Sequence, residues 1–369
     1  MSADTVRFVR IQDDELDPGP LPVPFHDATM GPFTHWKLRW LRLTADDGAV
    51  GQAPGELHPL ACQALLQEGP CTPQEWWRKL FWMLRNAGHR NPATSGLLFA
   101  VDMAVRDILA QRRGVAWHRF MGATRDEVPV YGSGGGTNLT TAQLVAEMRD
   151  LVRCGFSILK MKVGRNFGAC QDEDVERVRA VRGAIGPAAG LAVDANQVWT
   201  AEQALAFARR IADLNIAWFE EPVHSADRKA LRELCGSCPI PVAMGESENH
   251  WLGFRDLAEC GVAHLQPGPH SLPGYDRWRD ALAFAETAGR VWSSGGHSHL
   301  TAMYVATRPG GMVEYLRAII GHLATCFAAK PAIEKGVIRL PPTPGVPVRV
   351  DWEGLSARGA LRPMRDECA

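Results

Sequence analysis

An excess of charge of one sign is missing from this chain of 369 residues, in which 40 Lys and Arg side chains are balanced by 41 Asp and Glu. Nucleic-acid-binding proteins carry a basic face, and many membrane-surface proteins carry a polybasic segment. The formal net charge of −1 and an isoelectric point near 6.9 argue against both classes. The expected partners are small molecules and further copies of the chain, so we expect a homo-oligomer and neither a nucleic-acid nor a membrane partner.

Long hydrophobic runs and a disulfide pattern are also missing. No stretch reaches the roughly 18 consecutive apolar residues of a membrane span, and the first residues, "MSADTVRFVRIQDDELD", do not resemble a signal peptide. Nine cysteines are scattered at irregular intervals. Cys235 and Cys238 have CxxC spacing without a second pair, so we interpret them as helix-end cysteines rather than a zinc site. These features predict a cytoplasmic protein with reduced thiols.

Nucleotide-binding loops are absent as well. No Gly-rich dinucleotide fingerprint follows an early strand-like run. The stretch "YGSGGG" at residues 131–136 lacks the Lys-Ser/Thr pair of a phosphate-binding P-loop. We therefore expect chemistry that does not depend on a bound nucleotide.

The residues up to 126 have the pattern of an α+β unit. "THWKLRWLRLTADDGAVGQAPG" at 34–55 predicts two strands joined by an Asp-Gly turn. "TPQEWWRKLFWMLRNAG" at 72–88 and "SGLLFAVDMAVRDILAQRRG" at 95–114 have apolar residues at helical spacing. We expect this unit to form a separate N-terminal domain.

After residue 127 short apolar runs alternate with helical segments. Eight such runs begin at residues 128, 156, 190, 217, 241, 262, 290 and 312, with seven helical segments between them. This α/β rhythm predicts a (β/α)7β TIM-like barrel, and an open doubly wound sheet is the competing topology. The expected domains are an N-terminal capping domain at 1–126, the barrel at 127–330, and a Pro/Gly-rich C-terminal segment at 331–369 that completes the cap.

Three acidic residues stand at the ends of successive predicted strands. Asp194, Glu220 and Glu246 are separated by equal intervals of 26 residues. Because active sites of such barrels lie at the carboxyl ends of the strands, we expect these carboxylates to converge at one height. Three buried anions need a cation, and oxygen ligands of this type suit Mg²⁺. The next residue, Glu221, is expected to point away from the site, because neighbouring strand residues face opposite sides.

The preceding strand supplies positive charge. In "LKMKVG", Lys160 and Lys162 lie two residues apart, so both are expected inside the barrel. Two buried ammonium groups are costly without an anion or a catalytic task. Mutual crowding and a metal ion are expected to depress a lysine pKa toward neutrality, which would make a general base.

Lys-x-Lys followed by Asp, Glu and Glu on the next three strands resembles the enolase superfamily, specifically its mandelate racemase/muconate lactonizing enzyme branch. The segments "VDANQVW", "WFEEP", "MGE" and "VEYL" carry the similarity, which covers most of the chain. The resemblance implies a Mg²⁺-bound carboxylate substrate whose α-proton is removed to give an enediolate. It implies these roles: Asp194, Glu220 and Glu246 as metal ligands, Lys162 as base, Lys160 as electrostatic helper, Asn196 as a supporting residue beside the substrate, and Glu314 as hydrogen-bond partner of the substrate carboxylate.

The N-terminal loop "PVPFHDATMGPFTHW" corresponds to the part of the family's cap that reaches over the barrel mouth. Phe25 and His26 are therefore expected to contact the substrate, with Met30 and Phe33 as further candidates. Their mixed character leaves the kind of substrate open.

The second acid/base group of the family pattern is missing. Where family members carry an Asp after "QP" and a His after the seventh strand, this chain has Gly268 and Gly295. His297 is the candidate replacement if the loop is rearranged, and His270 and His299 are weaker candidates. No lysine of the muconate-lactonizing type occurs near "AHLQPG".

Racemisation needs a group on both faces of the substrate, whereas dehydration needs one base and a proton donor for the leaving hydroxyl, a role that Lys162 itself can fill in a syn elimination. The pattern therefore favours a dehydratase acting on a hydroxy acid or acid sugar. A racemase, epimerase or cycloisomerase of the same superfamily remains open, as does a catalytically silent homologue that binds Mg²⁺ and a carboxylate. A metal-free lyase that forms a Schiff base through Lys160 or Lys162 is the alternative from a different class.

Overall fold

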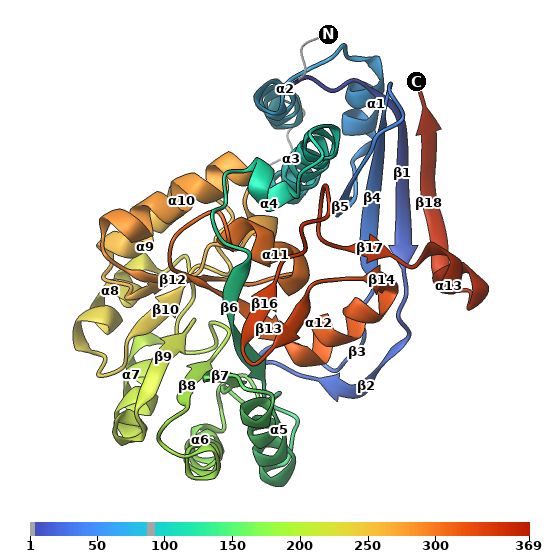
Figure 1. Cartoon of the computed structure of the whole chain (residues 1–369). Coiled ribbons are helices and arrows are strands. Elements are labelled where there is room, and N and C mark those ends of the chain that lie inside the picture. The colour runs from blue at the N-terminus through green and yellow to red at the C-terminus, as the bar shows by residue number, and fades with distance from the viewer. Residues whose placement is uncertain (1–3, 87–92) are drawn as a thin grey trace.

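A closed barrel of parallel strands forms the larger part of the computed structural model, which describes residues 4–86 and 93–369 (Figure 1). The barrel strands, in chain order, are β6 (Glu127–Gly134), β7 (Ile158–Lys162), β8 (Gly190–Asp194), β9 (Ile216–Glu220), β10 (Val242–Met244), β11 (His264–Leu265), β12 (Val291–Ser294) and β13 (Met312–Leu316). Each strand is hydrogen-bonded to the next, and β13 pairs with β6 to close the ring. The predicted barrel is confirmed, and the open sheet is excluded.

Helices connect the barrel strands and cover their outer face. They are α5 (Thr141–Arg153), α6 (Gln171–Ile185), α7 (Ala201–Arg210), α8 (Arg228–Ser237), α9 (Gly253–Glu259), α10 (Tyr275–Thr287) and α11 (Ser298–Val305). Thr140 and Thr200 begin α5 and α7 with capping boxes, in which each threonine hydroxyl accepts from the backbone N–H of a glutamine three residues on. This is the predicted (β/α)7β order. A further short helix, α12 (Arg317–Leu323), follows the eighth strand and was not predicted.

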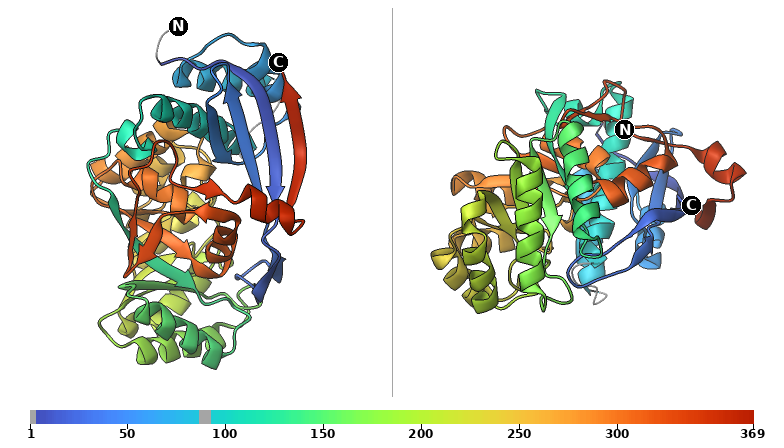
Figure 2. Two further views of the ribbon diagram at one scale, coloured as in Figure 1. Left: turned by 45° about the vertical axis from the view of Figure 1, so that its right-hand side comes forward. Right: turned by 90° about the horizontal axis from the view of Figure 1, so that it is seen from below.

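An antiparallel sheet with three helices lies beside the barrel (Figure 1). Its strands pair in the order β18 (Leu361–Cys368), β1 (Phe8–Leu16), β4 (Leu38–Ala45) and β5 (Val50–Pro54), and its helices are α1 (Pro59–Gln67), α2 (Pro73–Asn86) and α3 (Ala93–Arg112). Residues 87 and 88 of the helix predicted at 72–88 lie outside the described residues. Because β18 comes from the end of the chain, the C-terminal tail completes the N-terminal sheet, as predicted (Figure 2).

Shorter elements link the two units. They are β2 (Pro20–Phe25), β3 (Phe33–His35), α4 (Trp117–Phe120), β14 (Phe327–Ala329), β15 (Ala332–Glu334), β16 (Val337–Arg339), β17 (Arg349–Val350) and α13 (Trp352–Ala357). The tail contacts both units, since β16 pairs with the barrel strand β6 and β18 pairs with β1. The boundaries after residues 126 and 330 remain predictions.

Two aromatic side chains fill the interior of the barrel below the carboxylates. Tyr131 and Trp218 pack there with Ala192 and Ala243 as a buried cluster, and the two aromatic rings meet edge to face at a centroid distance of 5.2 Å. Ala192 and Trp218 each stand two residues before the acid that ends their strand, so this cluster lies directly beneath the carboxylates. Large side chains therefore fill the barrel interior below the acids, and the site lies at the carboxyl ends of the strands.

Helix α3 carries two buried carboxylates that connect the cap sheet to the rest of the molecule. Asp102 pairs with Arg106 at 3.0 Å and accepts from the backbone N–H of Tyr275 at 2.9 Å. Asp107 accepts from the backbone N–H groups of Gln52 in β5 and Val346 in the tail, each at 2.9 Å.

Among the described residues, no helix combines the length and the hydrophobicity needed to cross a bilayer.

Replacing Asp107 with alanine is expected to lower the free energy of unfolding by about 2–4 kcal/mol, because two buried backbone N–H groups would lose their acceptor. Urea denaturation followed by circular dichroism measures this change. Asp172→Ala is the matched control, since the Asp172 side chain is 90% exposed and pairs only at the surface. Equal stability of the two variants would contradict a structural role for Asp107.

Candidate active site

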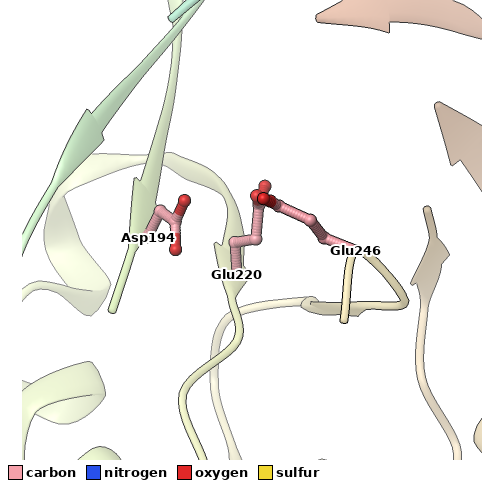
Figure 3. Close-up of side chains that lie close together, drawn as sticks. All are labelled: Asp194, Glu220 and Glu246. Atoms are coloured by element: carbon pink, nitrogen blue, oxygen red, sulfur yellow. The ribbon is translucent and has the colours of Figure 1, made fainter. Parts of the chain in front are cut away.

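Three carboxylates converge at the mouth of the barrel (Figure 3). Asp194 ends β8, Glu220 ends β9, and Glu246 follows β10 by two residues. One carboxylate oxygen from each lies within 4.8 Å of the others. Asp194 and Glu220 are fully buried, whereas Glu246 is exposed at the mouth. The structure thus brings together the trio that the sequence singled out.

The three acids do not stand at one height, as their equal spacing had suggested. Asp194 pairs in register with Glu220, but the residue of β10 level with Glu220 is Ala243. Glu246 therefore starts three residues farther along its strand direction. It reaches back because Gly245 adopts a φ of +130°, where a side chain would collide with Phe254 and with the backbone of the next strand.

Glu220 is oriented by one donor on its own strand and another directly after β11. The indole N–H of Trp218 donates to Glu220 Oε2 at 2.9 Å, and Gln266 Nε2 donates to the same oxygen at 2.7 Å. Sequence reasoning missed both donors. Trp218 was detectable, because a residue two positions before Glu220 faces the same side of the strand. Nothing local marks Gln266, which follows β11, a strand two places away in the barrel.

Both strand lysines lie inside the barrel against these acids. Lys162 Nζ is 2.5 Å from Asp194 Oδ2. Lys160 Nζ forms an ion pair with Glu220 and is 2.9 Å from Glu314 Oε1 on β13. The expected depression of a lysine pKa is not found in this arrangement. Burial alone would lower the pKa of Lys162, but the charge of Asp194 raises it above its usual value.

The side chains at the mouth carry an excess of negative charge, which a cation would balance. Four carboxylates, including Glu314, surround two ammonium groups. Burial raises the pKa of Glu220 to about 8 in spite of the neighbouring Lys160, and the charges of the other three carboxylates add to this shift, so a further positive charge would favour the ionised form of Glu220. A divalent ion bound by Asp194, Glu220 and Glu246 would supply this charge, and a purely oxygen-donating ligand set is the kind that Mg²⁺ prefers. The residues present therefore fit that metal.

Glu221 faces the opposite side of the strand end. Its side chain accepts from the backbone N–H of Ser247 and from Gln197 Nε2, each at 3.3 Å. It thereby connects the loops that follow β8 and β10. This acid supports the loop next to Glu246 and does not join the convergent trio.

Asn196 adjoins the carboxylates, Phe25 lines a pocket beside α12, and the contacts of both residues with a substrate remain predictions. The backbone N–H of Asn196 donates to Asp194 Oδ1 at 3.0 Å, and its own Oδ1 is buried without a partner among the described residues. Phe25 is only 6% exposed and lines a pocket of about 710 Å³ between β2, α5 and α12, outside the barrel wall. His26 is anchored through its backbone, which accepts from Thr137 and donates to Asn138 at the end of β6. Figure 1 shows β2 and β3 running along the barrel beside α12.

The other side of the mouth is formed by glycines and histidines. His297 is the residue that precedes α11, and its carbonyl accepts from the backbone N–H groups of Leu300 and Thr301. Burial lowers the pKa of His297 to about 4, and the nearby His270 and His299 add to this shift. His299 has a structural partner, since its Nδ1 lies 3.1 Å from the carbonyl of Pro331. The roles of these side chains in a reaction remain predictions.

Comparison with known proteins places this geometry in context. Residues 143–354 match the family described as Enolase C-terminal domain-like. A 3,6-anhydro-alpha-L-galactonate cycloisomerase of Streptomyces coelicolor is 30% identical over 349 residues, which span 91% of this chain and 95% of that protein.

Solved structures give the same picture at the level of the fold. A racemase from Streptomyces coelicolor A3(2), crystallised with bound magnesium, superposes with a TM-score of 0.84 at 27% identity over 95% of this chain and 99% of that one. An L-talarate dehydratase from Polaromonas sp. JS666, complexed with Mg and L-glucarate, has a TM-score of 0.83 at 25% identity and covers 99% of each chain. The similarity therefore includes both the cap and the barrel.

Proposed function

Since the chain belongs to the enolase superfamily, in its mandelate racemase/muconate lactonizing enzyme branch, we propose that it removes the α-proton of a small carboxylate substrate with the help of Mg²⁺. The enediolate so formed then loses a β-oxygen, and dehydration of a hydroxy acid or acid sugar is the reaction favoured. The observation that carries the proposal is the ammonium of Lys162, 2.5 Å from one acid of a convergent carboxylate trio. In the described parts of the chain, no other group of three or more carboxylate, histidine or cysteine side chains converges in this way.

Each side chain has a distinct task in this scheme. Asp194, Glu220 and Glu246 hold the metal, which, when bound, supplies positive charge to the substrate carboxylate as its α-carbon becomes acidic. As a ligand of such an ion, Asp194 would no longer hold Lys162 in an ion pair, and Lys162 would be free to act as the base. Lys160 stays between Glu220 and Glu314 and contributes fixed positive charge. Glu314 is the hydrogen-bond partner of the substrate carboxylate.

Cycloisomerisation is the second candidate, and the cycloisomerase of Streptomyces coelicolor that matches 91% of this chain favours it. Both reactions begin with the same proton transfer to Lys162. They differ in the oxygen that leaves the β-carbon, which is a free hydroxyl in dehydration and a ring oxygen in cycloisomerisation. The substrate therefore decides between them, while the residues required are the same.

The proposal is tested by incubating the protein with Mg²⁺ and a panel of linear and cyclic acid sugars in D₂O. We expect deuterium at the α-carbon of at least one acid by NMR, with formation of a 2-keto acid, and loss of both signals after EDTA treatment. Activity that survives EDTA, together with covalent trapping by borohydride, would favour the Schiff-base lyase instead. Binding of Mg²⁺ without any exchange would identify a catalytically silent homologue.

We further propose that the protein works in the cytoplasm as a homo-oligomer. All nine cysteines are free thiols, as in a reducing compartment. Light scattering coupled to gel filtration tests the assembly, and a single monomeric species would contradict it.

A further inference from the structure

Of three glycines on the far side of the mouth, two make room for one histidine. Gly268 follows β11, and Gly295 and Gly296 follow β12. A Cβ atom at Gly268 would lie 2.9 Å from Cε1 of His270, and one at Gly296 would lie 2.4 Å from Nδ1 of the same ring. The imidazole of His270 therefore occupies the space that side chains at these positions would need.

His270 lies on the opposite side of the barrel from Lys162. Lys162 is on β7, the second barrel strand, whereas His270 follows β11, the sixth of the eight in the closed ring. The two strands are four places apart, which is diametrically opposite in a barrel of eight. The strands of Asp194 and Glu220 lie on the arc between them, so a substrate held at the carboxylates would lie between these two side chains.

His270 is also close to the reacting end of the site. A Cβ at Gly295, next to the glycine that touches His270, would lie 2.9 Å from Glu314 Oε2. Glu314 in turn contacts Lys160 at 2.9 Å. His270 thus lies next to Gly296, and the adjacent Gly295 lies next to Glu314, which contacts Lys160.

His264 and His299 each make a side-chain hydrogen bond, whereas His270, like His297, makes none to another described residue. His264 is bonded to Ser293 at 2.9 Å and His299 to Pro331 at 3.1 Å. By contrast, Nδ1 of His270 is buried without a partner among the described residues. The ring lines a pocket of about 630 Å³ between the cap and the barrel. Burial lowers the pKa of His270 and makes its protonated form a stronger acid, whereas the charge of Glu314 favours protonation.

We propose that His270 is the proton donor on the face opposite Lys162, in place of the acid/base pair that Gly268 and Gly295 cannot provide. The role rests on the proposed function. Lys162 takes the α-proton, the electrons of that C–H bond form the new double bond, and the bond from the β-carbon to its oxygen breaks. The protonated imidazole of His270 gives its proton to the departing oxygen. Lys162 then returns its proton to solvent, and His270 regains one from it.

The experiment compares α-deuterium exchange with product formation in His270→Ala, using the acid that the wild-type protein exchanges. We expect product formation to fall by roughly 10²–10⁴-fold while exchange at the α-carbon continues, because only the second proton transfer is lost. Added imidazole is expected to restore part of the product formation by entering the space left by the ring. His224→Asn is the matched control, since His224 is exposed and an asparagine can keep its hydrogen bond to the backbone N–H of Ala226.

The outcomes separate this role from the proposed function. Product formation within threefold of wild type in His270→Ala, with exchange intact, would overturn the role of His270 and leave the function standing. A larger loss in His297→Asn than in His270→Ala would assign the donor to His297 instead. A wild-type protein that exchanges no acid in the panel would overturn the proposed function, and the donor role with it.

Discussion

Replacing Lys162 with alanine is expected to abolish α-deuterium exchange and to lower product formation by roughly 10³–10⁴-fold. The reason is that Lys162 is the proposed base, and the neighbouring Lys160 is held by Glu220 and Glu314. Mg²⁺ binding is expected to persist or to strengthen in the variant, because an ammonium group beside Asp194 is removed. Isothermal titration of Mg²⁺ and NMR-detected exchange measure the two effects separately.

Arginine substitutions distinguish a base from a fixed charge. Lys162→Arg keeps the positive charge beside Asp194 but cannot give up its proton near neutral pH, so it should be as inactive as Lys162→Ala. Lys160→Arg is the matched comparison, because a fixed positive charge is all that the scheme asks of that position. If Lys162→Arg retained exchange, Lys162 would be an electrostatic helper rather than the base.

The barrel and the position of its acids were predictable because both follow from local patterns. Short apolar runs that alternate with amphipathic helices leave few topologies, and closure followed from the absence of a nucleotide-binding loop. Strand ends in a barrel meet at one rim, so Asp194 and Glu220 were bound to approach each other. The lysines followed from the two-residue period of a strand.

Heights within the barrel were not predictable, because they depend on hydrogen-bond register rather than on residue spacing. The pairing of β8 with β9 shifts between Leu191 and Val193, and β10 places Ala243 level with Glu220. Equal sequence intervals therefore gave the right trio with the wrong geometry for Glu246. Gly245 has a positive φ that lets the chain turn, so that Glu246 approaches the other two acids. This role of Gly245 could be recognised only once the register was known.

The charge state of the lysines and the path of the N-terminal loop also required the structure. The pKa of a buried lysine depends on which acids lie next to it, and Lys162 was brought against Asp194 by the pairing of their two strands. Phe25 was predicted to contact the substrate because of its place in the loop, and this contact stays a prediction. The structure adds that Phe25 lines a pocket beside α12, a helix that the sequence did not indicate. Long-range packing of this kind leaves no local pattern.

The adjacent acids Glu220 and Glu221 give the second large prediction. Glu220→Gln is expected to weaken Mg²⁺ binding by roughly 100-fold or more, because it removes a buried charged ligand of the ion. Glu221→Gln is expected to weaken binding by about tenfold, since it disturbs only the loop that carries Glu246. Isothermal titration with Mg²⁺ alone measures both without a substrate.

This pair is a matched test because the two residues are adjacent in the chain, carry the same charge and are both buried. They differ in the side of the strand that they face. Glu220 is 0% exposed and Glu221 is 2% exposed, so loss of a buried charge as such would affect both alike. A larger effect at Glu220 would show that its direction toward Asp194 and Glu246 is what matters. An equal or larger effect at Glu221 would instead mean that the metal lies on the side of Gln197 and Ser247, and the assignment of Lys162 as base would fall with it, since Lys162 pairs with Asp194.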